Sequence, residues 1–156
     1  MIKTSNALIG LALGCAAAMM PPLGFAHGDV TPQAVDVSTL KPLGAKPVLE
    51  NPYRGNKEAI RVGSSAYNQN CARCHGLEAV SGGIAPDLRL LDRDCVALAA
   101  KEKQAACKKE IDEYYLTSTL RGKVRNNAVY MPPYEGTLSQ EAIWAIKAYL
   151  ETRGDK

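Results

Sequence analysis

The sequence predicts an all-α fold, and three observations lead to that prediction. Apolar residues recur at steps of three and four in two segments, one starting near Lys57 and one after Ser139. A third segment, from Asp94 to Leu120, is rich in Ala, Lys, Glu and Leu, which favour helices. No run shows a sustained alternation of apolar and polar residues, the pattern of a half-buried strand.

Length and charge limit the possible functions. The chain has 156 residues, which is about one domain and too short for a multidomain enzyme. Charged residues make up 22% of the sequence and hydrophobic residues 46%, as in an ordinary globular domain. The formal net charge is +3, a small excess that argues against a nucleic-acid binder, which needs a concentrated basic face.

Residues 1–26 have the features of a signal peptide. Lys3 supplies the positive start, and the uncharged run from Ala7 to Met20 is shorter than the ~20 residues that span a bilayer. Small residues precede the predicted cleavage after Ala26. The alternative is a retained anchor helix. A lipoprotein modified at Cys15 is rejected, because residues 16–25 would then form an apolar tether where a polar one is expected. We expect export to the periplasm, an oxidising compartment, of a mature chain with a charge of +2.

The mature chain begins with an extended arm, residues 27–57, followed by the helical domain, residues 58–156. Four prolines punctuate the arm: Pro32, Pro42, Pro47 and Pro52. Proline lacks an N–H group and fixes its own φ, so the arm is expected to lie along a preformed surface.

The first helix is predicted to start near Lys57 and to end at Gly76. One face would carry Ile60, Gly63, Tyr67, Cys71 and Cys74.

The second helical segment runs from Asp94 to Leu120, with Gly122 suited to end it. Residues 125–136 are expected to form a loop. The last helix starts at Ser139, a favourable N-cap, and its apolar stripe is Ile143, Ile146 and Leu150.

Residues 71–75 form the motif Cys-x-x-Cys-His, the attachment signature of c-type haem. Cys71 and Cys74 lie on one helical turn, so each thiol can add to a vinyl group of the same porphyrin, and His75 then falls under the iron. A thioredoxin-like centre would need a strand before the motif, and a zinc site would need further ligands.

The second axial position decides the function, because a vacant site allows ligand binding or peroxide chemistry. The candidates are His27, at the start of the mature arm, and Met131, the single Met outside the predicted signal peptide. Met131 lies in a Tyr-Met-Pro-Pro-Tyr loop stiffened by two prolines. We favour Met131 as the ligand over a role in core packing, and such a filled site leaves electron transfer.

These motifs resemble the class I c-type cytochromes, a helical bundle around one covalently bound haem. The resemblance implies that Gly63 and Tyr67 pack against Ile146 and Tyr149 of the last helix.

The loop after the haem motif also matches this family. By the resemblance, the Pro86 carbonyl accepts a hydrogen bond from His75, Leu88 lines the haem pocket, and the Met-Pro-x-aromatic loop corresponds to residues 131–134.

A closer resemblance covers nearly the whole mature chain. The proline-punctuated arm, the Tyr-Asn-Gln-Asn sequence before Cys71 and the extra cysteine pair resemble soluble cytochromes that accept electrons from pyrroloquinoline-quinone (PQQ) alcohol dehydrogenases, above all those that oxidise ethanol. This implies a monomeric periplasmic electron carrier with one haem c, not an enzyme, with a downstream oxidase or cytochrome as acceptor. The alternatives are a donor to a terminal oxidase and a haem enzyme or ligand sensor with an open axial site.

Two further features carry expectations. Cys95 and Cys107 are expected to form a disulfide, the alternative being two buried free thiols. An unbroken helix would hold their Cα atoms about 18 Å apart, so we expect a break near residues 101–104. Arg121, Lys123 and Arg125 form either a solvated loop or a docking patch for an acidic partner.

Overall fold

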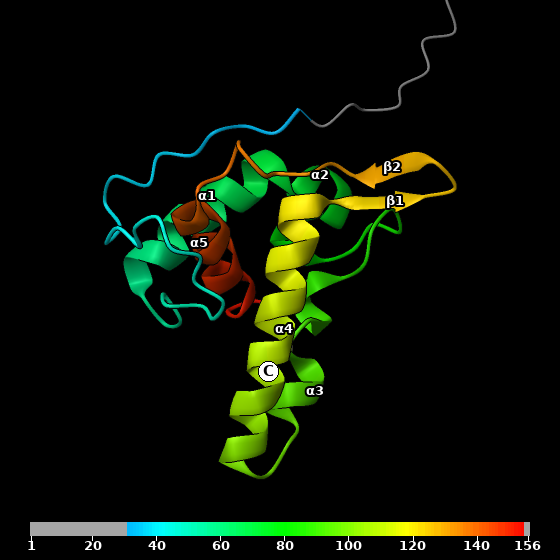
Figure 1. The fold of residues 1–156 in the computed structure, drawn as a ribbon. Coiled ribbons are helices and arrows are strands. Elements are labelled where there is room, and N and C mark those ends of the chain that lie inside the picture. The colour runs from blue at the N-terminus through cyan, green and yellow to red at the C-terminus, as the bar shows by residue number, and fades with distance from the viewer. Residues whose placement is uncertain (1–30, 155–156) are drawn as a thin grey trace, which may run out of the picture.

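The crossing of two helices, α1 (Lys57–Asn70) and α5 (Gln140–Leu150), forms the centre of the fold (Figure 1). The structure is a computed structural model that describes residues 31–154, so the predicted signal peptide and His27 lie outside the described residues. A Cβ atom on Gly63 would lie 1.9 Å from the carbonyl oxygen of Ala145. The two backbones therefore approach each other more closely than any side chain on Gly63 would allow.

Both central helices start at capping side chains. Asn56 accepts a hydrogen bond from the N–H of Ala59, and Ser139 accepts one from the N–H of Ala142, as the sequence predicted for Ser139. Helix α5 is buried around its whole circumference from Ala142 to Leu150, so it serves as the core of the molecule.

The contacts expected between the two helices are present. The rings of Tyr67 and Tyr149 lie with their centroids 5.3 Å apart. Gly63 faces the backbone of Ala145 and Ile146. The pairing of these residues, which the family resemblance implied, is confirmed.

Helix α1 ends earlier than the sequence predicted. Cys71, with a φ of −119°, interrupts the helix, and a second short helix, α2 (Ala72–His75), follows it. Gly76 ends α2 with a φ of 80°. Two single-turn 3₁₀ helices, η1 (Leu77–Ala79) and η2 (Leu88–Leu90), lie in the connection that follows.

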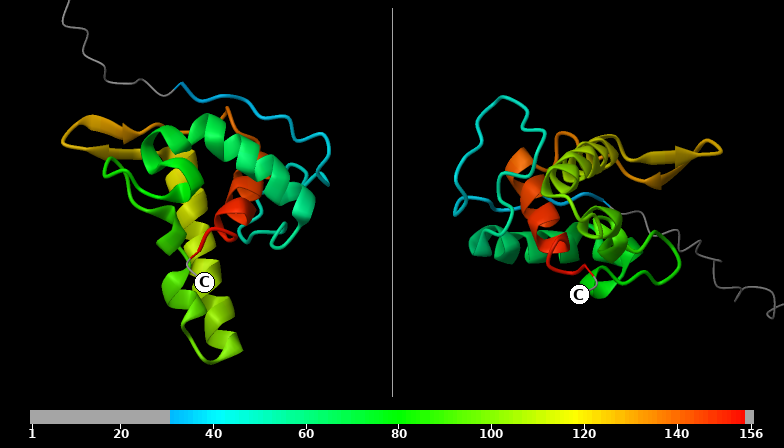
Figure 2. Two further views of the ribbon diagram at one scale, coloured as in Figure 1. Left: turned by 180° about the vertical axis from the view of Figure 1, so that it is seen from behind. Right: turned by 90° about the horizontal axis from the view of Figure 1, so that it is seen from below.

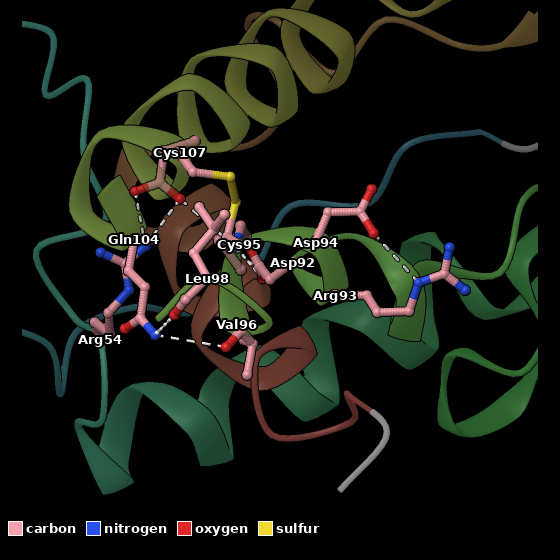
Figure 3. Close-up of a disulfide and its surroundings, with 11 residues drawn as sticks. Arg54, Asp92, Arg93, Asp94, Cys95, Val96, Leu98, Gln104 and Cys107 are labelled. Atoms are coloured by element: carbon pink, nitrogen blue, oxygen red, sulfur yellow. Dashed lines mark hydrogen bonds and ion pairs between the residues drawn. A yellow bond between two sulfur atoms is a disulfide. The ribbon is translucent and has the colours of Figure 1, made fainter. Parts of the chain in front are cut away.

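The segment after η2 forms a helical hairpin of α3 (Arg93–Val96) and α4 (Lys101–Arg121). The disulfide between Cys95 and Cys107 joins the two helices, with 5.4 Å between the Cα atoms (Figure 3). The bond is present as expected, but the predicted position of the break is wrong, because the chain turns at residues 97–100. Ala100 is extended there, and the Gln104 side chain donates to the carbonyl of Leu98 at 2.5 Å.

A small β-hairpin follows α4, where the sequence analysis expected only a loop. Strands β1 (Lys123–Arg125) and β2 (Ala128–Met131) pair antiparallel. Asn126 and Asn127 form the turn with φ values of 50° and 60°, the left-handed conformation that a two-residue hairpin turn requires and that Asn tolerates. The fold remains mainly helical, as predicted.

Residues 31–56 of the arm follow the surface of α1 and α5 (Figure 1). Its backbone binds side chains of the last helix: the N–H of Leu43 donates to Glu141 at 2.9 Å and that of Val48 to Gln140 at 3.2 Å. The indole N–H of Trp144 donates to the carbonyl of Val48 at 3.2 Å. The arm therefore satisfies its polar backbone on elements formed elsewhere in the chain.

Candidate functional site

The two cysteines of the Cys-x-x-Cys-His motif lie at the ends of one helical turn. The backbone N–H groups of Cys74 and His75 both donate to the carbonyl of Cys71, at 3.1 and 3.0 Å. Both thiols are half-buried and neither forms a disulfide. Burial, with a smaller contribution from Cys74, raises the pKa of the Cys71 thiol to about 12. A dithiol redox centre needs the opposite shift, and this motif follows a helix and not a strand.

His75 is held by the loop that follows it. Its Nδ1 lies 2.9 Å from the carbonyl oxygen of Pro86, the contact that the family resemblance implied. A ring that donates from Nδ1 presents the lone pair of Nε2 to a metal, and the bond raises its basicity.

Hydrogen bonds hold the loop between His75 and Pro86 in place. Tyr67 donates its hydroxyl to the carbonyl of Gly76 at 2.7 Å. Asp87 accepts from the N–H of Ser81 at 3.4 Å and from Arg89, and the hydrogen bond from Arg89 is the main reason that the pKa of Asp87 falls to about 2. The loop is therefore tied to α1 at one end and closed on itself at the other.

Met131 is the last residue of β2 and is half-buried against the core. It pairs with Lys123, one step past an irregularity in the register that leaves Tyr130 as an extra residue. Gly122 allows the chain to pass here, since a Cβ on it would lie 2.3 Å from the carbonyl oxygen of Met131. A bulge of this kind turns the side chain that follows it and is frequent beside functional sites.

The segment carrying His75 and the hairpin carrying Met131 lie on the same side of α4 (Figures 1 and 2). Five large apolar or aromatic side chains on these two segments are more than 60% exposed to solvent. They are Leu77, Ile84, Val124, Val129 and Tyr130. Large exposed apolar side chains on neighbouring segments are typical of a binding surface, and a flat apolar porphyrin attached at Cys71 and Cys74 fits such a surface. Leu88 is partly buried and packs against the core.

The sequence analysis matched Tyr134 to the Met-Pro-x-aromatic loop but did not foresee the contact by which it joins the two segments. The hydroxyl of Tyr134, three residues after Met131, donates to the carbonyl of Asn70 at 2.6 Å, and both residues are buried. Sequence spacing could not reveal this contact, because 64 residues separate its partners. The sequence offered only a general indication: if the Tyr of this loop is buried, its hydroxyl needs a hydrogen-bond partner.

Comparison with known proteins agrees with this geometry. The family model described as cytochrome c oxidase, cbb3-type, subunit III matches residues 58–150. Cytochrome c550 of Pseudomonas aeruginosa is 49% identical over 97% of each chain. No solved structure matches the chain.

Two quinohemoprotein alcohol dehydrogenases of Pseudomonas putida are similar over short segments. ADH IIB is 26% identical over 67% of this chain and 13% of its own length. ADH-IIG is 44% identical over 29% of this chain and 6% of its own length.

The chain belongs to the c-type cytochrome family that this model and the cytochrome c550 relative define. It is a monohaem electron-transfer protein with one covalently bound haem c, and it carries electrons instead of acting as an enzyme. Within residues 31–154, none of the helices is long and apolar enough to cross a membrane.

Proposed function

We propose that this cytochrome is a monomeric periplasmic carrier that accepts electrons from a PQQ-dependent alcohol dehydrogenase and passes them to an oxidase or another cytochrome. The observation that carries the choice of partner is the similarity to two quinohemoprotein alcohol dehydrogenases. A domain related to a haem-containing part of such enzymes suits the role of a separate carrier for quinoprotein electrons.

In this proposal Cys71 and Cys74 attach the haem, and His75 and Met131 are its axial ligands. The haem iron supplies the redox chemistry by cycling between the ferrous and ferric states. The protein's own residues set the surroundings: Pro86 fixes the ring of His75, and Leu88 supplies an apolar wall. A thioether from Met131 favours the reduced iron and raises the potential.

The axial assignment is tested with Met131→Ala. We expect the ferric protein to lose the thioether-to-iron charge-transfer band in the red, the midpoint potential to fall, and the ferrous protein to bind carbon monoxide. The parent protein should exclude carbon monoxide. A Met131→Ala protein with the parent spectrum and no carbon monoxide binding contradicts the assignment, and carbon monoxide binding by the parent favours the ligand-sensor alternative.

The partner is tested by stopped-flow reduction with a purified quinoprotein alcohol dehydrogenase and its alcohol. Fast second-order reduction of the cytochrome supports the proposal. The second candidate, a donor to a terminal oxidase, draws support from the oxidase-subunit description of the matching family. Slow reduction by the dehydrogenase, together with fast oxidation by membranes that hold a cbb3-type oxidase, favours that second candidate.

The location and size of the mature protein are tested on material from a native host. The periplasmic fraction should contain a monomer whose mass corresponds to a chain starting at His27 plus one haem. A protein retained at full length in the membrane fraction contradicts cleavage after Ala26.

A further inference from the structure

The helix break at Cys71 leaves a backbone acceptor that the helix itself does not use. In a continuous helix the carbonyl of Asn70 would accept from the N–H of Cys74. Instead, the N–H groups of Cys74 and His75 both donate to Cys71. The carbonyl of Asn70 therefore does not receive the hydrogen bond that a continuous helix would give it. Asn70 is only 3% exposed, and a buried carbonyl without a hydrogen bond lowers the free energy of unfolding.

Tyr134 fills this position from the other half of the site. Its hydroxyl donates to the Asn70 carbonyl at 2.6 Å, and the Tyr134 residue is 3% exposed. Burial raises the pKa of Tyr134 above its usual value, so the hydroxyl stays protonated and keeps donating. The contact therefore joins the residue before Cys71 to the loop that follows Met131.

The backbone of Tyr134 is fixed as well. Its N–H donates to the carbonyl of Thr119 at 3.0 Å, and the N–H of Glu135 donates to Leu120 at 3.2 Å, both at the end of α4. The two residues between Met131 and Tyr134 are prolines with restricted φ. The position of Tyr134 is thus transmitted to Met131 through a short and stiff segment.

The arm supports the same point. The side-chain oxygen of Asn70 accepts from the backbone N–H of Gln33 at 2.7 Å, and its amide donates to Ala66 at 3.2 Å. Asn70 therefore holds the arm with its side chain and the Met131 loop with its carbonyl.

From these contacts we infer that Tyr134 is a positioning residue, whose hydrogen bond to Asn70 keeps the Met131 loop closed over the haem-attachment motif. This inference rests on the proposed ligation by Met131. Loss of the hydroxyl should raise the population of a state in which the loop has opened and an external ligand can replace Met131.

The test is imidazole binding to the ferric protein in Tyr134→Phe, which keeps the ring and removes the hydroxyl. The apparent affinity for imidazole should rise about tenfold, the effect of losing one buried hydrogen bond. Tyr53→Phe is the matched control, because Tyr53 is also buried and its hydroxyl donates to a backbone carbonyl, that of Lys41 in the arm. Its imidazole affinity should equal that of the parent. The charge-transfer band of Tyr134→Phe without imidazole should also bleach at a lower temperature than global unfolding.

A merely structural role would lower the urea midpoint of Tyr134→Phe and leave its imidazole affinity at the value of the parent and the control. That result overturns the inference. Met131→Ala separates this failure from that of the proposed function. If Met131→Ala keeps the charge-transfer band, both are wrong; if it loses the band while Tyr134→Phe binds imidazole like the parent, the inference alone is wrong.

Discussion

Gly63 permits the close crossing of α1 and α5. Any side chain at this position meets the Ala145 carbonyl, which belongs to the backbone of a fully buried helix and cannot move aside. The residue lies in a helix, where glycine costs about 1 kcal/mol relative to alanine. Close backbone contact, and not backbone freedom, therefore explains the glycine.

Gly63→Ala should accordingly destabilise the protein, although alanine is the better helix former. We expect a loss of about 3 kcal/mol from overpacking, measured by urea unfolding followed by circular dichroism. Gly82→Ala is the control, because a Cβ at Gly82 meets no atom within 4 Å. A Gly63→Ala protein as stable as the Gly82→Ala protein would show that the helices separate at little cost.

The sequence analysis named candidate residues for the site but not all of the contacts that hold them. The attachment motif could be recognised because covalent attachment of a haem requires Cys71, Cys74 and His75 at a defined spacing. The contact of Tyr134 with Asn70 depends on the helix break at Cys71, which no local pattern announces. The axial roles of His75 and Met131 remain predictions.

At the scale of elements, the helical hairpin of α3 and α4 shows both the reach and the limit of sequence patterns. The disulfide argument required a break in the helix, and a break exists. Its position at residues 97–100 was not predicted, because Ala and Leu there have high helix propensity. The disulfide requires the Cα atoms of Cys95 and Cys107 to lie close together, and they are 5.4 Å apart. A continuous helix could not bring them this close, so the helix breaks in spite of the propensity of these residues.

The β-hairpin was missed for a different reason. Strands of three and four residues are too short for alternation to be recognised. The adjacent Asn126 and Asn127 were the available turn signal, since Asn adopts positive φ more readily than most residues. Because the hairpin ends at Met131, the loop that follows has a defined start in β2 and a defined end at Tyr134.

The disulfide should be present in the mature protein and should stabilise the α3–α4 hairpin. Alkylation without reductant followed by mass spectrometry should find no modified cysteine. The Cys95→Ala/Cys107→Ala variant should lose about 3 kcal/mol in the chain-entropy model, measured by urea unfolding. Its visible spectrum should match that of the parent, because the bond lies outside the site; two alkylated cysteines in the parent would contradict the bond.

At the scale of the whole molecule, a buried ionic cluster joins segments that are distant in the sequence. Lys147 of α5 is fully buried, and its ammonium lies 2.6 Å from Asp92, 3.0 Å from Glu151 and 3.6 Å from Asp112. Arg54 of the arm pairs with Asp112 at 2.9 Å and with Glu151 at 3.0 Å. In the sequence Lys147 lies within an apolar stripe. Glu151 follows it by four residues on the same helix, but Asp92 and Asp112 come from distant segments, so the cluster as a whole could not be foreseen.

This cluster predicts how stability depends on pH. Burial by itself would raise the pKa of Glu151, but the Lys147 ammonium and the Arg54 guanidinium outweigh it and hold that pKa below the usual value. A carboxyl whose pKa is lowered by folding adds stability above its unfolded pKa of about 4.3, and this contribution is lost as the pH falls through the folded pKa.

Lys147→Met should therefore destabilise the protein most near neutral pH. We expect a loss of about 3 to 5 kcal/mol at pH 7, because the carboxylates lose their buried partner. The loss should be smaller at an acidic pH below the lowered folded pKa of Glu151, where this carboxyl no longer carries a charge for Lys147 to neutralise. Lys109→Met is the control, since Lys109 forms only an exposed pair with Glu50 at 3.8 Å, worth less than about 1 kcal/mol. Urea unfolding at both pH values decides; an equal loss at each would exclude the ionic explanation.

The charge around the hairpin bears on how the whole molecule meets its partner. Arg121, Lys123 and Arg125 are exposed, and no acidic residue occurs from 116 to 134. The ammonium of Lys123 lies 4.7 Å from the centre of the Tyr114 ring, a contact that joins β1 to α4. A cluster of one sign next to the site steers an acidic partner in a way that a net charge of +3 does not.

We expect neutralisation of these three cations to slow reduction by the alcohol dehydrogenase. At low ionic strength the second-order rate of the Arg121→Gln/Lys123→Gln/Arg125→Gln variant should fall about tenfold, and the difference should shrink as salt screens the attraction. The control carries the same charge change in the first half of α4, away from the hairpin, as Lys101→Gln/Lys103→Gln/Lys109→Gln (Figure 1). Because steering is local, the control should keep most of the parent rate and salt slope. Equal losses in the two variants would assign the effect to net charge, and parent-like rates in both would leave the hairpin cations as a solvated surface.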